Sequence, residues 1–256
     1  MNPLAIAIAV YLGAHLFRMV RMAVLLGESA RSLRAVVLAQ AITAPAGLLP
    51  FKMGELARIM AIGRATRGVA HGGVAVWIER TYDAAALVVA SIVALLILGD
   101  SGGFVWPVAL LAGGFLAMTT LAIVVWPEQM TMAKGWLIRR YSTPWSLVAL
   151  RVLHQIGAEL RSVRGLVRNK TATLALLTAA VWALEALALW MLVPSGRGVW
   201  SAILGAQSQI VSPGSSDGLA LHRTAVVAGV VILGSTGLAL AAVRTALVRT
   251  QLAGSR

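Results

Sequence analysis

Long runs of apolar residues decide what this chain can fold into. They cover residues 4–26, 73–99, 104–126 and 171–193, and each is close to or above the roughly 20 residues that an α-helix needs to cross a bilayer. The strands of a membrane β-barrel are instead about ten residues long and alternate in polarity. With 59% hydrophobic and only 12% charged residues, the chain is far more apolar than a soluble domain. The sequence therefore predicts an all-α, polytopic transmembrane helical bundle.

Basic residues are distributed unevenly along the chain. Clusters follow the run at 4–26, flank residues 35–63 and fill residues 127–170, whereas the loops at 100–103 and 195–200 hold a single arginine between them. Since Lys and Arg accumulate on the cytoplasmic side of a bacterial-type inner membrane, we expect the N-terminus outside and the C-terminus in the cytoplasm. The net charge of +13 then favours membrane lipids as partners and argues against nucleic acid.

The first apolar run differs from a cleavable signal peptide. It has no basic residue ahead of it and carries Arg18 and Arg21 at its end, which is the reverse of the order in a signal peptide. We therefore expect a retained first span, with both arginines in a cytoplasmic basic cluster.

Residues 35–63 are apolar on both sides of an interruption, TAPAGLLPFKMGE. Pro45 and Pro50 each remove a backbone donor and clash with the preceding turn, so one undisturbed helix cannot form. Each arm of about 14 residues is about 21 Å long, which is short for a bilayer core of about 30 Å. Because basic residues flank both ends, we expect a re-entrant hairpin that enters from the cytoplasm. Two ordinary kinked helices are the alternative.

The second arm of this hairpin has the features of an anion site. It would begin near the middle of the bilayer, where the free N–H groups and the dipole of a helix N-terminus favour a negative charge. Lys52 and Arg58 would add full positive charges.

A similar construction occurs near the other end of the chain. The string SPGSSDG, residues 212–218, lies between two apolar arms, and Ser216 or Asp217 can cap the second arm, which carries Arg223. We expect this second unit to enter from the outside. Two interrupted segments that face opposite sides are typical of inverted-repeat transporters. The fold prediction therefore includes two re-entrant or broken helix hairpins in a pseudo-inverted repeat.

Acidic residues inside apolar stretches indicate a functional interior. A charge at the centre of a span costs about 2.5–3.5 kcal/mol, so such residues must be paired, protonated or hydrated. Glu185 is a candidate protonatable group or a partner for Arg223. The acidic residues within apolar stretches are Glu55, Glu79, Asp83, Glu185 and Asp217.

Glu79 and Asp83 are four residues apart and share a helix face, with Arg80 beside them. Two interpretations of this cluster stay open. It clamps Arg58 or Lys52 in a structural ion pair, or it takes part directly in transport.

Residues 127–170 form the longest polar segment. Between residues 149 and 168 the apolar and polar side chains fall on opposite faces of a helix. We expect an amphipathic segment in the cytoplasmic interface, and a helix that binds a partner protein would show the same pattern. This segment joins approximate halves 1–126 and 171–256 of a single transmembrane domain, 1–256. A homo-oligomer is left open.

The sequence contains no motif for cysteine, metal or nucleotide chemistry. The chain has no cysteine, so disulfides and cysteine-ligated metals are excluded, and its four histidines lack metal-ligand spacing. No P-loop or HExxH motif occurs, and we therefore expect no metal and no cofactor. A glycosyltransferase would need a carboxylate-rich loop for a metal and a sugar nucleotide, and none is evident. The sequence favours a protein that is not an enzyme.

Several of these segments together resemble the lysylphosphatidylglycerol synthase transmembrane-region family, also described as flippase-like membrane proteins. The resemblance rests on FRMVRMAVLL, LLPFKMGELARI, WIERTYDAAAL, VWALEALALW and the late Pro-Gly break. The residues that match the family's motifs are Pro50, Lys52, Gly54, Glu55, Arg58, Glu79, Arg80, Asp83, Pro213, Gly214 and Gly218. The Arg-Glu pair typical of the family's second break is absent. In multi-domain relatives the membrane region is taken to move a charged lipid that a separate soluble domain makes. These 256 residues include no such domain, so aminoacyl transfer is not expected.

The resemblance and the charge pattern imply one function and one alternative. We expect a lipid flippase that moves an anionic phospholipid or a polyprenyl-phosphate-linked lipid between leaflets. The alternative is a scaffold or accessory subunit for an envelope glycosyltransferase or lipid-modifying enzyme. The expected substrate-binding residues are Lys52, Gly54, Glu55, Arg58, Glu79, Arg80, Asp83, Glu185, Pro213, Gly214, Ser215, Ser216, Asp217 and Arg223.

Overall fold

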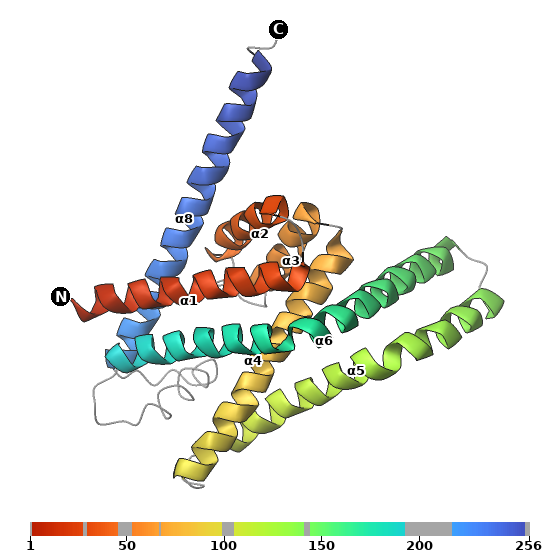
Figure 1. The fold of residues 1–256 in the computed structure, drawn as a ribbon, viewed down its shortest axis with the longest axis horizontal. Helices are drawn as coiled ribbons and strands as arrows, with labels where there is room; N and C mark the ends of the chain where they lie inside the picture. The colour runs from red at the N-terminus through yellow and green to blue at the C-terminus, as the bar shows by residue number, and fades with distance from the viewer. Residues whose placement is uncertain are drawn as a thin grey trace.

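Figure 1 shows the computed structural model of the chain, which describes residues 2–27, 30–45, 53–66, 68–98, 105–140, 144–192 and 217–253. Its helices are α1 (Pro3–Leu26), α2 (Ala30–Thr43), α3 (Met53–Ala65), α4 (Val69–Leu98), α5 (Val105–Arg140), α6 (Pro144–Leu192) and α8 (Asp217–Ala253). No strand occurs in these ranges, so the predicted all-α class is confirmed.

Several helices of the fold are long enough to span a membrane. In the described part of the chain, four segments are long and apolar enough to cross a membrane: Pro3–Leu26 of α1, Val105–Ile123 of α5, Asn169–Leu192 of α6 and Thr224–Val243 of α8. The predicted apolar run at 73–99 lies largely within α4. The chain is therefore a multi-pass membrane protein.

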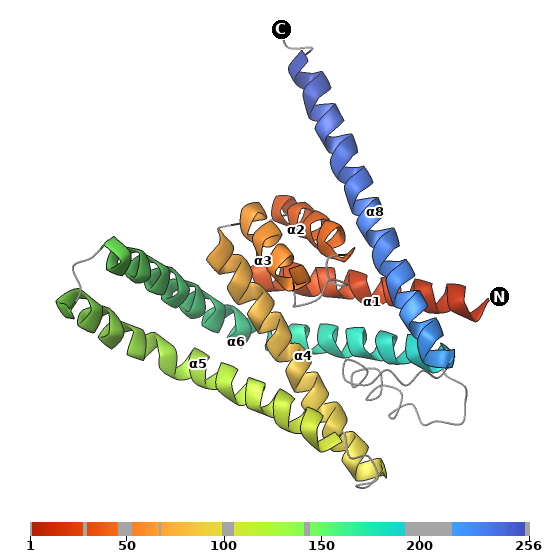
Figure 2. The same cartoon turned by 180° about the vertical axis from the view of Figure 1, so that it is seen from behind.

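The centre of the molecule is built on α1 and the C-terminal half of α6, which lie side by side in opposite directions (Figures 1 and 2). Ala7 near the start of α1 packs in one buried cluster with Leu192 near the end of α6. At the other end of α1, Leu25 packs in a second cluster with Leu174. The helix α4 crosses this pair, and α5 lies along α4.

A third apolar cluster joins four helices near the end of α1. Met22 of α1, Val36 of α2, Ile62 of α3 and Ala75 of α4 are all buried in it. This cluster holds α2 and α3 against the central helices. Each Å² of apolar surface that this junction removes from water stabilises the folded protein by about 25 cal/mol.

The helix break expected within residues 35–63 is confirmed. The first arm, α2, has 14 residues and the second arm, α3, has 13, which correspond to about 21 Å and about 20 Å. Pro50 and Lys52, which lie between them, are outside the described residues. Neither arm is long enough to cross a bilayer core of about 30 Å.

The second expected break lies mostly outside the described residues. The structure describes nothing from 193 to 216, and it resumes at Asp217, where α8 begins. The expected first arm and the predicted inverted repeat therefore stay predictions. The helix α8 crosses α1 and reaches α2: Gly229 lies against Tyr11, and Gly237 lies against Ala41. Its C-terminal half extends away from the other helices in Figure 1.

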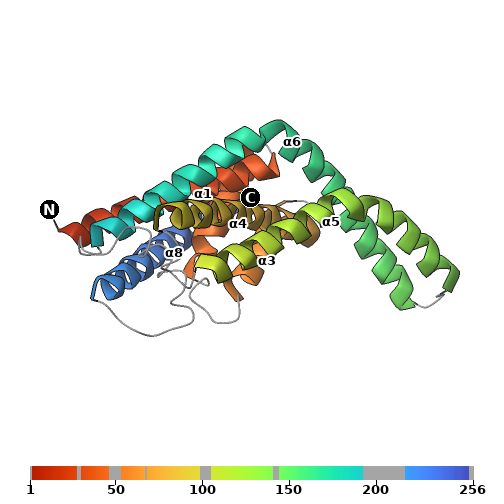
Figure 3. The same cartoon turned by 90° about the horizontal axis from the view of Figure 1, so that it is seen from below.

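Residues 127–170 do not form a separate helix. Those that the structure describes, 127–140 and 144–170, make up the end of α5 and the first half of α6, and α6 continues without interruption to Leu192. Figure 3 shows that both helices bend, so that this part of the α5–α6 pair turns away from the rest of the bundle. Pro127 lies inside α5, and a proline in a helix interior produces a kink. The position of this pair along the cytoplasmic interface stays a prediction.

Two glycines allow α3 and α4 to touch through their backbones. A Cβ atom on Gly72 of α4 would lie 2.6 Å from the carbonyl oxygen of Ile59 and 2.9 Å from the amide nitrogen of Gly63, both in α3. Small residues allow this close approach between membrane helices. The neighbouring Gly73 has more space, because a Cβ there would meet only the Ile59 side chain, at 3.8 Å.

We predict that Gly72→Ala destabilises the protein and that Gly73→Ala does not. The first change forces two backbones apart, and overpacking of this kind costs about 1–3 kcal/mol. The second change adds ordinary van der Waals contact and replaces a helix-weakening glycine by alanine. Thermal unfolding of the two purified variants in detergent measures the difference. Equal midpoints would contradict the close α3–α4 contact.

Candidate functional site

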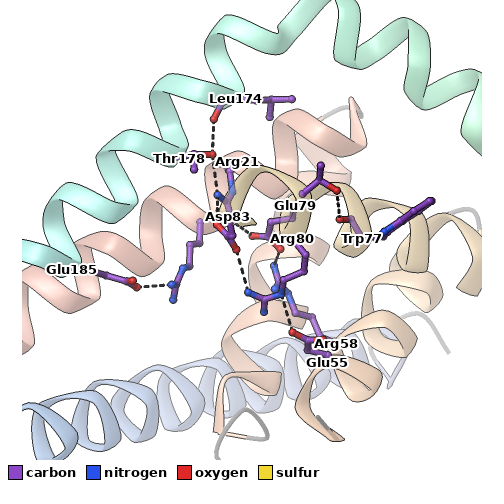
Figure 4. Close-up of polar contacts among 12 residues, drawn as sticks. Arg21, Glu55, Arg58, Trp77, Glu79, Arg80, Asp83, Leu174, Thr178 and Glu185 are labelled. Atoms are coloured by element: carbon purple, nitrogen blue, oxygen red, sulfur yellow. Dashed lines mark hydrogen bonds and ion pairs between the residues drawn. The ribbon is translucent and has the colours of Figure 1, made fainter. Parts of the chain in front are cut away.

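Charged side chains meet where α1, α3, α4 and α6 approach one another (Figure 4). Four are arginines and four are carboxylates, so the formal charges of the described members balance. They are Arg18 and Arg21 of α1, Glu55 and Arg58 of α3, Glu79, Arg80 and Asp83 of α4, and Glu185 of α6. Each lies in a helix whose surroundings are mainly apolar. Pairing is what allows charged groups to occupy such a place.

Arg21 is the centre of this ionic cluster. Its side chain is fully buried, and it donates from Nη2 to Glu79 Oε1 at 3.0 Å and from Nη1 to Asp83 Oδ1 at 2.8 Å. Nη1 also donates to Thr178 Oγ1 of α6 at 2.9 Å. The Thr178 hydroxyl donates to the Leu174 carbonyl oxygen at 2.8 Å, so its lone pairs face the arginine. Arg21 thus ties α1 to α4 and α6.

Glu79 links Arg21 to α3, because it accepts hydrogen bonds from Arg21 and from Arg58 of α3. Its second carboxylate oxygen, Oε2, accepts from Arg58 Nη2 at 2.5 Å. Glu79 is 1% exposed, and both of its oxygens are engaged. The ion pair expected between the Glu79 cluster and Arg58 is therefore present, and it holds Arg58 in one place.

Two further ion-pair groups complete the cluster. Arg80 donates from Nη1 to Asp83 Oδ2 at 3.1 Å, and its Nε lies 2.8 Å from Glu55 Oε1 without hydrogen-bond alignment. Arg18 Nη2 lies 2.5 Å from Glu185 Oε1, which joins α1 to α6. The Arg18 and Glu185 side chains are 25% and 20% exposed, whereas the Arg21 side chain is fully buried.

Two cavities adjoin the cluster. The first has a volume of about 210 Å³ and is lined by residues of α1, α2, α3, α4 and α8. The second has a volume of about 650 Å³, and apolar residues of α4 and α5 form much of its wall. Arg18, Glu55 and Arg80 line both cavities. The ion pairs therefore stand at the boundary between the two spaces.

The structure brings together seven of the residues expected in the site. These are Gly54, Glu55, Arg58, Glu79, Arg80, Asp83 and Glu185. Five others lie outside the described residues: Lys52, Pro213, Gly214, Ser215 and Ser216. Asp217 and Arg223 belong to α8, but their side chains are not described. The partner that the structure shows for Glu185 is Arg18.

Arg18 and Arg21 were expected in a basic cluster on the cytoplasmic side. The structure pairs both side chains with carboxylates instead, and the side of the membrane on which they lie stays a prediction. They point into the bundle, where each meets carboxylates of other helices. A signal for this is present in the sequence: Tyr11, His15 and Arg18 are spaced by four and three residues, so they form a polar stripe on one face of an apolar helix. All three line the first cavity.

We predict that Arg21→Ala is far more destabilising than Arg18→Ala. Loss of Arg21 leaves two buried carboxylates without their shared partner, and breaking a buried ion pair costs about 3–5 kcal/mol. The Arg18 pair is partly exposed, so its loss costs less. Thermal unfolding in detergent, read as the shift in midpoint, measures both effects. A larger shift for Arg18→Ala would mean that Arg21 is not the centre of the network.

The family of the chain follows from a comparison with family models. The model described as "Lysylphosphatidylglycerol synthase TM region" matches residues 1–195, which include all described members of the ionic cluster. No curated protein and no solved structure matches the chain. The matched part is about three quarters of the 256 residues and ends before α8. The protein therefore belongs to the lysylphosphatidylglycerol synthase transmembrane-region family.

Proposed function

We propose that this protein moves a lipid headgroup between the two leaflets of a membrane. The observation that carries the proposal is the ionic cluster with its adjoining cavities, built inside a bundle of apolar helices. Charged side chains in a membrane interior are costly, and they commonly mark a path for a polar substrate. A headgroup could cross this bundle without entering hydrocarbon. The proposed substrate is an anionic phospholipid or a polyprenyl-phosphate-linked lipid.

In this proposal α2 and α3 form a re-entrant hairpin that enters from the cytoplasm. Thr43 and Ala44 at the end of α2, and Gly54 in the first turn of α3, line the same cavity. Both arms are too short to cross, and interrupted backbone at membrane depth is tolerated where it lines a cavity. The first turn of α3 would then direct its N–H groups towards an anion.

The proposed re-entrant hairpin predicts that the start of α2 and the end of α3 lie on the same side of the membrane. Arg34 near the start of α2 and Arg64 near the end of α3 are both exposed, and the protein has no native cysteine. Single cysteines at these two positions should react with a membrane-impermeant maleimide only from the cytoplasmic side of oriented vesicles. Cysteine at Asn2, before α1, should react only from outside. Labelling of positions 34 and 64 from opposite sides would show that the α2–α3 unit crosses the membrane.

Within the cluster we assign different roles to the charged residues. Arg58, which reaches the first cavity, contacts the headgroup together with Lys52. Glu55, Glu79 and Asp83 hold the arginines in position. The second break, with Pro213 to Ser216, Asp217 and Arg223, forms the opposing gate.

We predict that Arg58→Gln abolishes translocation of a fluorescent anionic phospholipid by the purified protein in liposomes. Arg58→Lys should restore part of the activity, because an ammonium group keeps the charge beside Glu79 but lacks the planar fork of donors. Arg151→Gln is the matched control, since Arg151 is exposed on α6 away from both cavities. Dithionite quenching measures the lipid that stays in the outer leaflet. Unchanged translocation in a folded Arg58→Gln protein would remove Arg58 from the path.

The scaffold alternative has one structural observation in its favour. The first half of α6 turns away from the bundle and exposes Arg151, Val152 and Arg161, which is a suitable surface for another protein. Purification from native membranes separates the two functions. A stoichiometric enzyme partner, combined with no lipid movement by the isolated protein, would favour the scaffold.

A further inference from the structure

One ion pair of the cluster lies outside the network that joins α3 to α4. It is the pair between Arg18 of α1 and Glu185 of α6 (Figure 4). Every other ion pair among the described members of the cluster involves α4. The Arg18–Glu185 pair can therefore open while the links that hold α3 and α4 together stay closed.

The other carboxylates of the cluster are held more firmly in their ionised form. Glu79 and Asp83 each accept hydrogen bonds from two arginines. Glu55 is paired with Arg80 and lies in the first turn of α3, where the helix dipole favours a negative charge. Glu185 has a single arginine partner among the described residues, and it lies in the interior of α6. A proton therefore displaces the fewest favourable interactions at Glu185.

The second cavity, which Glu185 lines, has a surplus of negative charge among its described residues. Its charged side chains come from α1, α3, α4 and α6, and its α5 residues are apolar. The described side chains of α8, within Thr224–Val243, carry no charge either. Uptake of one proton brings the formal charge of this wall from −1 to zero. The charged residues are two arginines, Arg18 and Arg80, and three carboxylates, Glu55, Asp83 and Glu185.

Arg18 connects the charge of Glu185 to the first cavity. Its side chain lines both cavities, and Tyr11 and His15 of the same helix line the first one. While Glu185 is ionised, its Oε1 atom lies 2.5 Å from Arg18 Nη2 and holds the guanidinium. A neutral Glu185 attracts the guanidinium far less, so the positive charge of Arg18 becomes available to an anion in the path. Protonation of Glu185 therefore changes the electrostatics of both cavities.

We propose that Glu185 binds the proton that couples lipid movement to a proton gradient across the membrane. The coupling rests on the proposed function, whereas the proton site itself does not. In one state Glu185 is ionised and paired with Arg18, as in the structure. In the other state Glu185 is protonated, the pair is open, and Arg18 faces the path. One proton is bound and one is released in each cycle. Acidic residues within membrane helices serve pumps and transporters in this way.

The first test detects the proton itself and needs no lipid movement. Infrared difference spectra between neutral and mildly acidic pH are recorded for the purified full-length chain in detergent, because a protonated carboxyl group has a carbonyl band that a carboxylate lacks. The variants are Glu185→Gln and the double variant Arg18→Gln/Glu185→Gln, which removes both charges together and leaves neither without its partner. Glu159→Gln is the matched control, at a position where α6 turns away from the bundle.

We expect the carboxyl band in the unmodified protein and in Glu159→Gln, and its loss in both Glu185 variants. A Glu185 with only a structural role would stay ionised wherever the protein stays folded, and no band would depend on it. The double variant keeps the test decisive if Glu185→Gln alone does not fold. A band that persists in both Glu185 variants, or no band in the folded unmodified protein, would overturn the proton site.

The second test measures coupling in liposomes that carry a pH gradient. Dithionite quenching of a fluorescent anionic phospholipid follows its movement. We expect the gradient to change the rate severalfold in the unmodified protein and to leave the rate of Glu185→Gln unaltered. A sodium gradient at equal pH on both sides should have no effect. A response to sodium that Glu185→Gln abolishes would overturn the proton as the coupling ion.

The two tests together separate the coupling from the proposed function. Lipid movement that ignores the pH gradient in the unmodified protein would overturn the coupling and leave the proposed function standing. If the infrared band depends on Glu185 and the liposomes show no lipid movement with or without a gradient, the proposed function fails and the proton site stands.

Discussion

The sharing of Glu79 between Arg21 and Arg58 is the interaction on which the remaining arrangement depends. A buried arginine cannot shed its charge, so it must be surrounded by acceptors. Arg21 finds them on α4 and α6, and this fixes how the three helices approach. The same carboxylate then holds Arg58 of α3. One side chain thus connects the closed interior of the bundle to the wall of a cavity.

Features that depend on local backbone chemistry could be predicted from the sequence. Pro45 and Pro50 exclude one undisturbed helix wherever they occur, and the described helices α2 and α3 end and begin on either side of this segment. The spacing of Glu79 and Asp83 places both on one helix face, and the structure shows both on Arg21. These inferences needed no knowledge of distant contacts.

Features that depend on contacts between distant residues could not be predicted in this way. Arg21 is 58 residues from Glu79 and 157 residues from Thr178, and a count of basic residues near span ends cannot detect such partners. The spacing within residues 127–170 suits an interfacial helix and also the extension of a membrane helix. Only the structure shows that α6 is continuous over 49 residues.

The backbone contact between Gly63 and Gly72 has a mechanical consequence. Two helices whose main chains touch have no flexible side chains between them to absorb a displacement, so α3 cannot slide along α4 without separating from it. Glu55 and Arg58 on one helix, and Glu79 and Arg80 on the other, are joined by ion pairs on the same two elements. Any rocking of the α3 arm would therefore carry these four side chains as one rigid block, and the cavity wall would move without losing its internal pairing.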